Sequence, residues 1–163
     1  MHELTRQIEQ VIREEIVGFR RLIELAEQEH EILLQGEHQR LMQTAEEKLS
    51  LCQELMSKRE KRRRLIASLA PEADSPPSLE LVEPHLEPDR KGPFRRAVAE
   101  LAALAKRLGN LSDTNRLYLE DALDTVEHLL AIMTGVESDP QGKEGPYRGG
   151  KAPNLPRFLA KEV

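Results

Sequence analysis

The residues best suited to chemistry are Glu27 and His30, which have the spacing of the Glu-x-x-His half-motif of di-iron helical bundles. In that motif a carboxylate and an imidazole one helical turn apart share a metal ion. A complete site needs a second copy, and no acid stands three residues before His38 or His128. The sequence therefore predicts no metal site and no cofactor.

Other catalytic patterns are also missing. The chain has no phosphate-binding G-x-x-x-x-G-K-[ST] loop, no His-Glu-x-x-His pair, no Cys-x-x-Cys and no G-x-S-x-G elbow. The single cysteine, Cys52, falls at a helical apolar position, where a thiol is usually a small buried hydrophobic group. We therefore expect that the protein is not an enzyme.

A basic run, residues 58–64, contains six basic residues and one acid and carries a net charge of +5. It could bind phosphate backbones. Consecutive helical residues spread around the helix instead of forming a stripe, and the chain has no aromatic residues among them for base stacking. A helix end in water, partly neutralised by a neighbouring helix, is the preferred interpretation over nucleic-acid binding.

Composition indicates the fold class. Of 163 residues, 24 are Lys or Arg and 29 are Asp or Glu, which gives a net charge of −5. Aromatic residues make up only 3 %, which argues against an aromatic β-sandwich or barrel, while 39 % hydrophobic residues are too many for a disordered chain. With one cysteine, no signal peptide and no long apolar run, we expect a cytoplasmic, all-α protein without membrane insertion.

Prolines divide the chain. None occurs in residues 1–70 or 94–139. This predicts one helical domain, 1–134, with helices over about 3–34, 37–70 and 94–134 and a Pro-rich, loop-like or disordered connection over 71–93. Residues 135–163, rich in Gly and Pro, are predicted to be a flexible tail.

Apolar residues in the first block recur every three or four positions, which predicts an amphipathic helix. This seam is Ile8, Ile12, Ile16, Phe19, Ile23, Ala26, His30 and Leu33. After Gly36 a second seam follows: Leu41, Ala45, Lys48, Cys52, Leu55, Arg59, Arg62, Ile66 and Leu69. A turn at Gly36 would make an antiparallel hairpin, in which the stretch with Arg59 and Arg62 faces Glu9, Glu14 and Glu15.

The third block is apolar along two adjacent stripes, so it can pack on the hairpin as part of a three-helix coiled-coil bundle. Gly109-Asn110 could end a helix, but the heptad phase continues through it, so we expect one long helix. We expect it to run antiparallel to the second helix. Ser112 and Asn115 interrupt its seam and either fix the register or face water.

Two stretches resemble the FlgN-type flagellar type III export chaperones. Leu33-Leu34-Gln35-Gly36-Glu37 is similar to that family's hairpin tip, and residues 115–119 with the apolar positions after them are similar to its third helix. Ser112 and Tyr118 depart from the family pattern.

The resemblance implies a cytosolic chaperone that binds hook-associated proteins through their C-terminal helical segments, prevents premature assembly and delivers them to the export gate. A client helix would lie on the third helix, with the tail folding over it. The candidate client-binding residues are Val126, Leu129, Leu130, Ile132, Met133, Val136, Leu155, Phe158 and Leu159, and Tyr147 is the candidate for docking on the cytosolic domain of the export gate. The alternatives are a structural coiled-coil adaptor or oligomer without client delivery and, third, a nucleic-acid-associated protein using residues 58–64.

Overall fold

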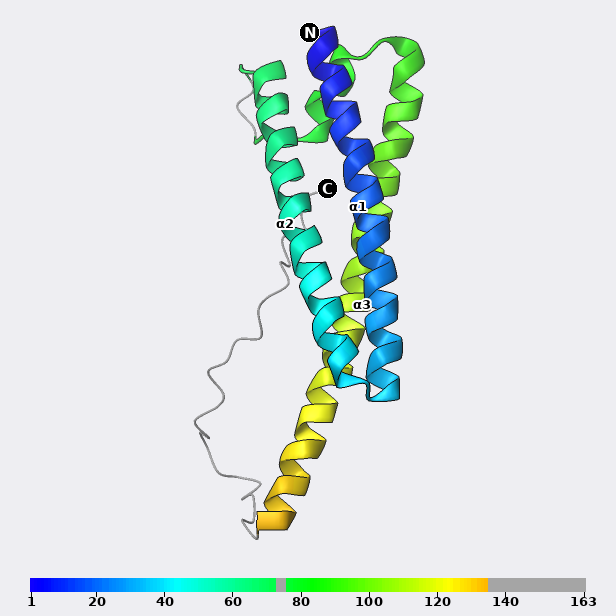
Figure 1. Ribbon diagram of the computed structural model, residues 1–163. Coiled ribbons are helices and arrows are strands. Elements are labelled where there is room, and N and C mark those ends of the chain that lie inside the picture. The colour runs from blue at the N-terminus through cyan, green and yellow to red at the C-terminus, as the bar shows by residue number, and fades with distance from the viewer. Residues whose placement is uncertain (73–75, 135–163) are drawn as a thin grey trace.

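Three long helices form the protein (Figure 1), as the composition predicts. The computed structural model describes residues 1–72 and 76–134. Helix α1 spans His2–Gln35, α2 spans His38–Leu69 and α3 spans Pro88–Thr134. Two short 3-10 helices, η1 (Leu79–Leu81) and η2 (Glu83–His85), lie between α2 and α3. The all-helical prediction is therefore confirmed.

The hairpin turn lies at Gly36, where the sequence places it. Gly36 has φ 71°, a left-handed conformation that favours glycine. Its N–H donates to the carbonyl of Leu33, and the N–H of Glu37 donates to that of Ile32. This pair of bonds is the Schellman arrangement that ends many helices, and it turns the chain directly into α2.

The two predicted seams meet in the core of the hairpin, except at Ala45, which is exposed while Thr44 beside it is buried. Both α1 and α2 contribute buried residues to this core: Ile8, Ile12, Ile16, Phe19, Ile23, Ala26, Cys52, Leu55, Ile66 and Leu69. The helices come close at Gly18, where an added Cβ would lie 2.6 Å from Leu55 Cδ2. Cys52 is buried, and this burial raises the pKa of its thiol. Cys52 therefore serves as a core hydrophobic group, as expected.

Helix α3 runs beside α1 in the same direction, and so antiparallel to α2, as predicted. Three ion pairs join the two helices in register: Glu9–Arg90, Arg20–Glu100 and Glu27–Arg107. The helix is unbroken through Gly109-Asn110. Its apolar seam is buried at Phe94, Leu101, Ala105 and Leu108.

The start of α3 differs from the expectation. The helix begins at Pro88 and contains Pro93, whereas the proline pattern placed its start at Phe94. A proline removes only one helical hydrogen bond, here the one to the carbonyl of Asp89 in the exposed first turn. Pro88 stands at the first helical position, where proline is well tolerated, and Pro93 in the second turn costs only this one bond, so the prolines here do not mark the boundary.

The Pro-rich connection also packs more than a loop-like segment would. Val82 and Leu86 are buried in the same core cluster as Phe94 and Ile66. The two 3-10 helices therefore close the end of the bundle that lies away from the hairpin turn (Figure 1).

Candidate functional site

A buried polar layer joins all three helices near the hairpin turn. Asn115 of α3 is 2 % exposed, and its Nδ2 donates to the backbone carbonyl of Ala26 and to Glu29 Oε2, each at 2.8 Å. Lys48 of α2 donates to the same Glu29 oxygen at 2.6 Å. His30 Nδ1 lies 3.1 Å from Asn115 Oδ1. Of the two interpretations of Asn115, the structure supports the one in which it fixes the register of the helices and not the one in which it faces water.

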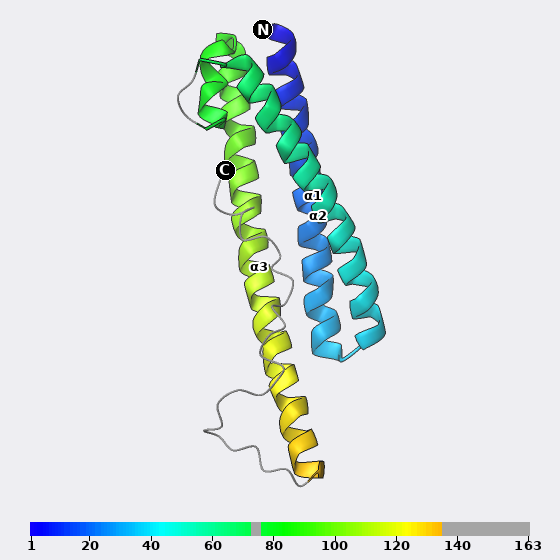
Figure 2. The same ribbon diagram turned by 90° about the vertical axis from the view of Figure 1, so that its left-hand side faces the viewer.

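Helix α3 leaves the hairpin just after this layer. Tyr118 makes the next contact, an edge-to-face contact with His30 at 5.0 Å between ring centres. Leu119 is half-buried, and every residue from 120 to 130 is exposed. Figure 1 and Figure 2 show this end of α3 continuing past the turn between α1 and α2. We call residues 117–134 the projecting end.

The projecting end carries a row of exposed apolar side chains. Val126 is 52 % exposed, Leu129 54 % and Met133 83 %. Leu119, Val126 and Met133 follow one another at heptad spacing, with Leu123 and Leu130 on a second row beside them. A contiguous exposed apolar stripe of this kind is typical of helix surfaces on which partners pack.

Several predicted site residues share this surface, and the structure does not describe the others. Val126, Leu129, Leu130 and Met133 are all exposed on the projecting end. Ile132 belongs to the same helix, and its side chain is not among those described. Five candidates lie outside the described residues: Val136, Tyr147, Leu155, Phe158 and Leu159.

Leu117 and Leu123, 60 % and 61 % exposed, are missing from the predicted set although they lie on the same end of α3. Their signal is present in the sequence. Leu123 stands one heptad before Leu130, and Leu117 is part of the Asn115–Leu119 segment. Leu123 therefore extends the predicted surface toward the polar layer, whereas Leu117, two residues before Leu119, lies on the opposite side of the helix.

The charge around this stripe is acidic. The projecting end carries four acidic residues, Glu120, Asp121, Asp124 and Glu127. The basic residue next to it in the sequence is Arg116. Arg116 contacts Glu120 at 3.9 Å. Glu120 and Glu127 flank the stripe on one side, whereas Asp121 and Asp124 lie farther around the helix. Acids beside an apolar stripe favour a partner whose helix carries basic residues beside its own stripe.

The chemical candidates have structural partners instead. Glu27 pairs with Arg107, while His30 contacts Asn115 and Tyr118, so the two side chains of the half-motif do not converge. Among residues 1–72 and 76–134 no cluster of three or more His, Cys, Asp or Glu side chains could hold a metal ion. None of the described helices is long and apolar enough to cross a membrane.

The basic run is divided by the fold. Arg62 is buried beside Glu15 of α1, with Nη1 3.1 Å from Oε2, while Arg64 is exposed and bonds to Glu60 of its own helix. The predicted pairing of this stretch with Glu15 is confirmed, whereas Glu9 pairs with Arg90 of α3. Residues 58–64 thus do not form one cationic stripe.

Comparison with known proteins identifies the family of this chain. A family model described as FlgN protein matches residues 1–145. No match was found among curated proteins or among solved structures. The matched range includes the hairpin, the connection and all of α3, and it confirms the resemblance to this family. The chain therefore belongs to the FlgN family, the flagellar export chaperones for hook-associated proteins.

Proposed function

We propose that the projecting end of α3 is the surface on which this chaperone holds its client. The observation that carries the proposal is the change along a single helix. Up to Leu108 the seam of α3 is buried against α1, and after Leu119 the same seam continues with no helix of the described chain covering it. An exposed apolar stripe that continues a buried core is suited to pack against an amphipathic helix of a partner.

The client element would be an amphipathic helix, namely the C-terminal helical segment of a hook-associated protein. It would cover Leu123, Val126, Leu129 and Met133, which are the side chains that cost most to leave in water. The same burial would hide the apolar face of the client segment and so prevent its premature assembly. Leu155, Phe158 and Leu159 of the tail are candidates to cover the other side of the client helix.

Delivery requires a second contact, with the cytosolic domain of the export gate. We propose Tyr147 for it, because it is the aromatic residue of a Gly-rich stretch directly after α3. Tyr147→Ala should leave the client complex intact and weaken binding of the chaperone–client complex to the gate domain. If the variant bound the gate domain as well as the original chain does, Tyr147 would have no such role.

The client face is tested with Leu129→Asp combined with Met133→Asp. Two charges in the middle of the stripe should abolish the client complex in size-exclusion chromatography with light scattering. The matched control is Met42→Asp with Leu49→Asp, two side chains of α2 that are 68 % and 61 % exposed. The control should bind client as the original chain does.

Three results are informative. Loss of binding in the α3 variant alone supports the proposed face, and a client lacking its C-terminal helices should fail to bind the original chain. Full binding by the α3 variant would refute the face. A self-assembled species that the α3 variant abolishes, with no client complex at any stage, would favour the coiled-coil adaptor instead.

A further inference from the structure

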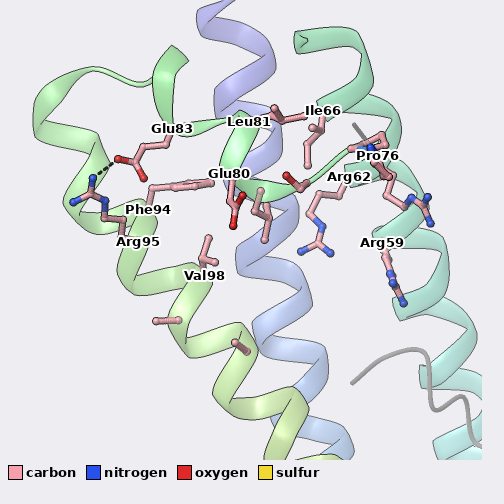
Figure 3. Close-up of a pocket in the computed structure, with 16 residues that line it drawn as sticks. Arg59, Arg62, Ile66, Pro76, Glu80, Leu81, Glu83, Phe94, Arg95 and Val98 are labelled. Carbon is pink, nitrogen blue, oxygen red and sulfur yellow. Dashed lines mark hydrogen bonds and ion pairs between the residues drawn. The ribbon is translucent and has the colours of Figure 1, made fainter. Parts of the chain in front are cut away.

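A cleft separates α2 from α3 at the end of the bundle away from the hairpin turn. Both helices pack on α1 and contact each other little, so residues 1–72 and 76–134 leave the corner of the bundle opposite α1 open. The cleft has a volume of about 710 Å³. Figure 3 shows its two walls, with Ile66 and Arg62 from α2, Phe94 and Val98 from α3, and Leu81 of the connection above them.

The walls differ in chemistry. The α3 side is apolar, with Phe94, Val98, Ala99 and Ala102. The α2 side carries three arginines, Arg59 and, one turn later, the adjacent Arg62 and Arg63, together with Ile66. A ligand for this cleft therefore needs an apolar side and a negative charge.

Arg62 shows where that charge would go. Its side chain is only 6 % exposed, and its guanidinium points into the cleft (Figure 3). Nε and Nη1 are buried and have no hydrogen-bond acceptor among the described residues, because Glu15 Oε2, although 3.1 Å from Nη1, does not form a hydrogen bond with it. Buried donors of this kind cost free energy until an acceptor is supplied.

The acidic residues at the rim of the cleft do not supply an acceptor for Arg62. Glu83 accepts a hydrogen bond from Arg95 of α3, drawn as the dashed line in Figure 3, and this bond holds the pKa of Glu83 below its usual value. Glu80 also lines the cleft and forms no ion pair with Arg62. An outside carboxylate is the group that fits Arg62, since a guanidinium can bind a carboxylate through two N–H donors.

We propose that this cleft binds an acidic amphipathic helical segment of a partner protein, which packs apolar side chains on Phe94 and Val98 and places a carboxylate on Arg62. The lining residues of α3 run from 94 to 102, about 12 Å at 1.5 Å per residue, which matches two turns of a guest helix. A helix lying between α2 and α3 would complete a four-helix arrangement around the core.

This site is separate from the client face. Val98 and Val126 are 28 positions apart on one helix, a distance of roughly 40 Å. The two surfaces also have opposite charge, basic in the cleft and acidic on the projecting end. They therefore select partners of different chemistry and could be occupied together.

The test is selection of helical peptides from a phage-displayed random library on the full chain. Binders are then sorted with two variants: Ala99→Trp, which fills the cleft from an exposed position, and Leu129→Asp with Met133→Asp, which spoils the client face. Ala103→Trp, an exposed alanine outside the cleft, is the matched control for the added indole.

We expect one class of peptides that loses binding on Ala99→Trp and keeps it on Ala103→Trp and on the client-face variant. These peptides should combine Asp or Glu with apolar residues at helical spacing. Arg62→Gln should weaken them about tenfold to a hundredfold, as should replacing the peptide acid by its amide, because each removes one charge-assisted bond. Arg62→Lys should retain part of the affinity.

Two outcomes would overturn the proposal. One is that no peptide is lost on Ala99→Trp. The other is that the peptides lost on Ala99→Trp carry no acid or bind Arg62→Gln unchanged. Replacing the peptide acid leaves the chaperone untouched, so this arm decides the question even if Arg62→Gln unfolds. Failure of the cleft leaves the client face standing, because the client-face variant reports on that surface alone.

Discussion

The buried carboxyl group of Glu15 should make the stability of this protein fall as the pH rises through neutrality. Its side chain is 3 % exposed and lies beside Arg62. Burial raises its pKa from 4.5 to about 7, against the smaller lowering effects of Arg62, Arg59 and Lys58. The folded protein therefore holds a proton on Glu15 at pH values where the unfolded chain has released it.

The sign and size follow from linkage. Below pH 4.5 the carboxyl is protonated in both states, and between 4.5 and about 7 only the folded state binds the proton, so stability is lost as pH rises through this window. The difference between these two pKa values corresponds to roughly 3 kcal/mol at about 1.4 kcal/mol per pKa unit. Above the window the loss is complete and the curve levels off.

The assay is urea unfolding followed by circular dichroism at several pH values from 4.5 to 8. Glu15→Gln, which keeps the neutral shape of the protonated acid, should remove most of the slope, so that the two proteins differ by roughly 3 kcal/mol more at the upper end than at the lower. Glu54→Gln on the exposed face of α2 is the matched control and should follow the original chain. Parallel curves for Glu15→Gln and the original chain would refute the reasoning.

Three further outcomes are expected. Asn115→Leu should lower the free energy of unfolding in urea by about 2–3 kcal/mol, because it removes two buried donors from the polar layer; an unchanged midpoint would contradict this. Gly18→Ala should destabilise by about 1–2 kcal/mol in thermal unfolding, because its Cβ would overlap Leu55, and Leu55→Ala should then cost less in that background than alone. Leu129→Asp with Met133→Asp should change the free energy of unfolding by less than about 0.5 kcal/mol, since both side chains are more than half exposed, and a larger loss would mean that they pack within the monomer.

Periodicity was enough to predict the hairpin and the course of α3. The seam positions include Lys48 and Arg62, and both are buried where the period places them. A period gives the side of a helix that faces the core, but not which residue of another helix lies opposite. The partners Glu29 and Glu15 could be found only once the helices were placed together, although the opposed charges near Arg62 indicated the second pair.

The connection and the cleft could not be predicted in the same way. Val82 and Leu86 are buried by 3-10 turns that are too short to show a period. Their apolar character in the sequence therefore did not indicate which side of the segment faces the core. The cleft depends on how far α2 and α3 diverge over α1, which is a property of three-body packing. The residues of the tail proposed for client and gate contacts remain predictions.

The polar layer at Asn115 has a consequence for how far α3 reaches. A heptad seam by itself permits α3 to slide along α1 by seven residues, about 10 Å, and still present apolar side chains to the core. Such a slide would bring Leu108 or Ala122 to the place of Asn115 and leave Glu29 and Lys48 buried without the amide. Asn115 therefore fixes the register of α3 on α1. This register sets how many turns of α3 extend beyond the hairpin, and thus the length of surface available to a partner.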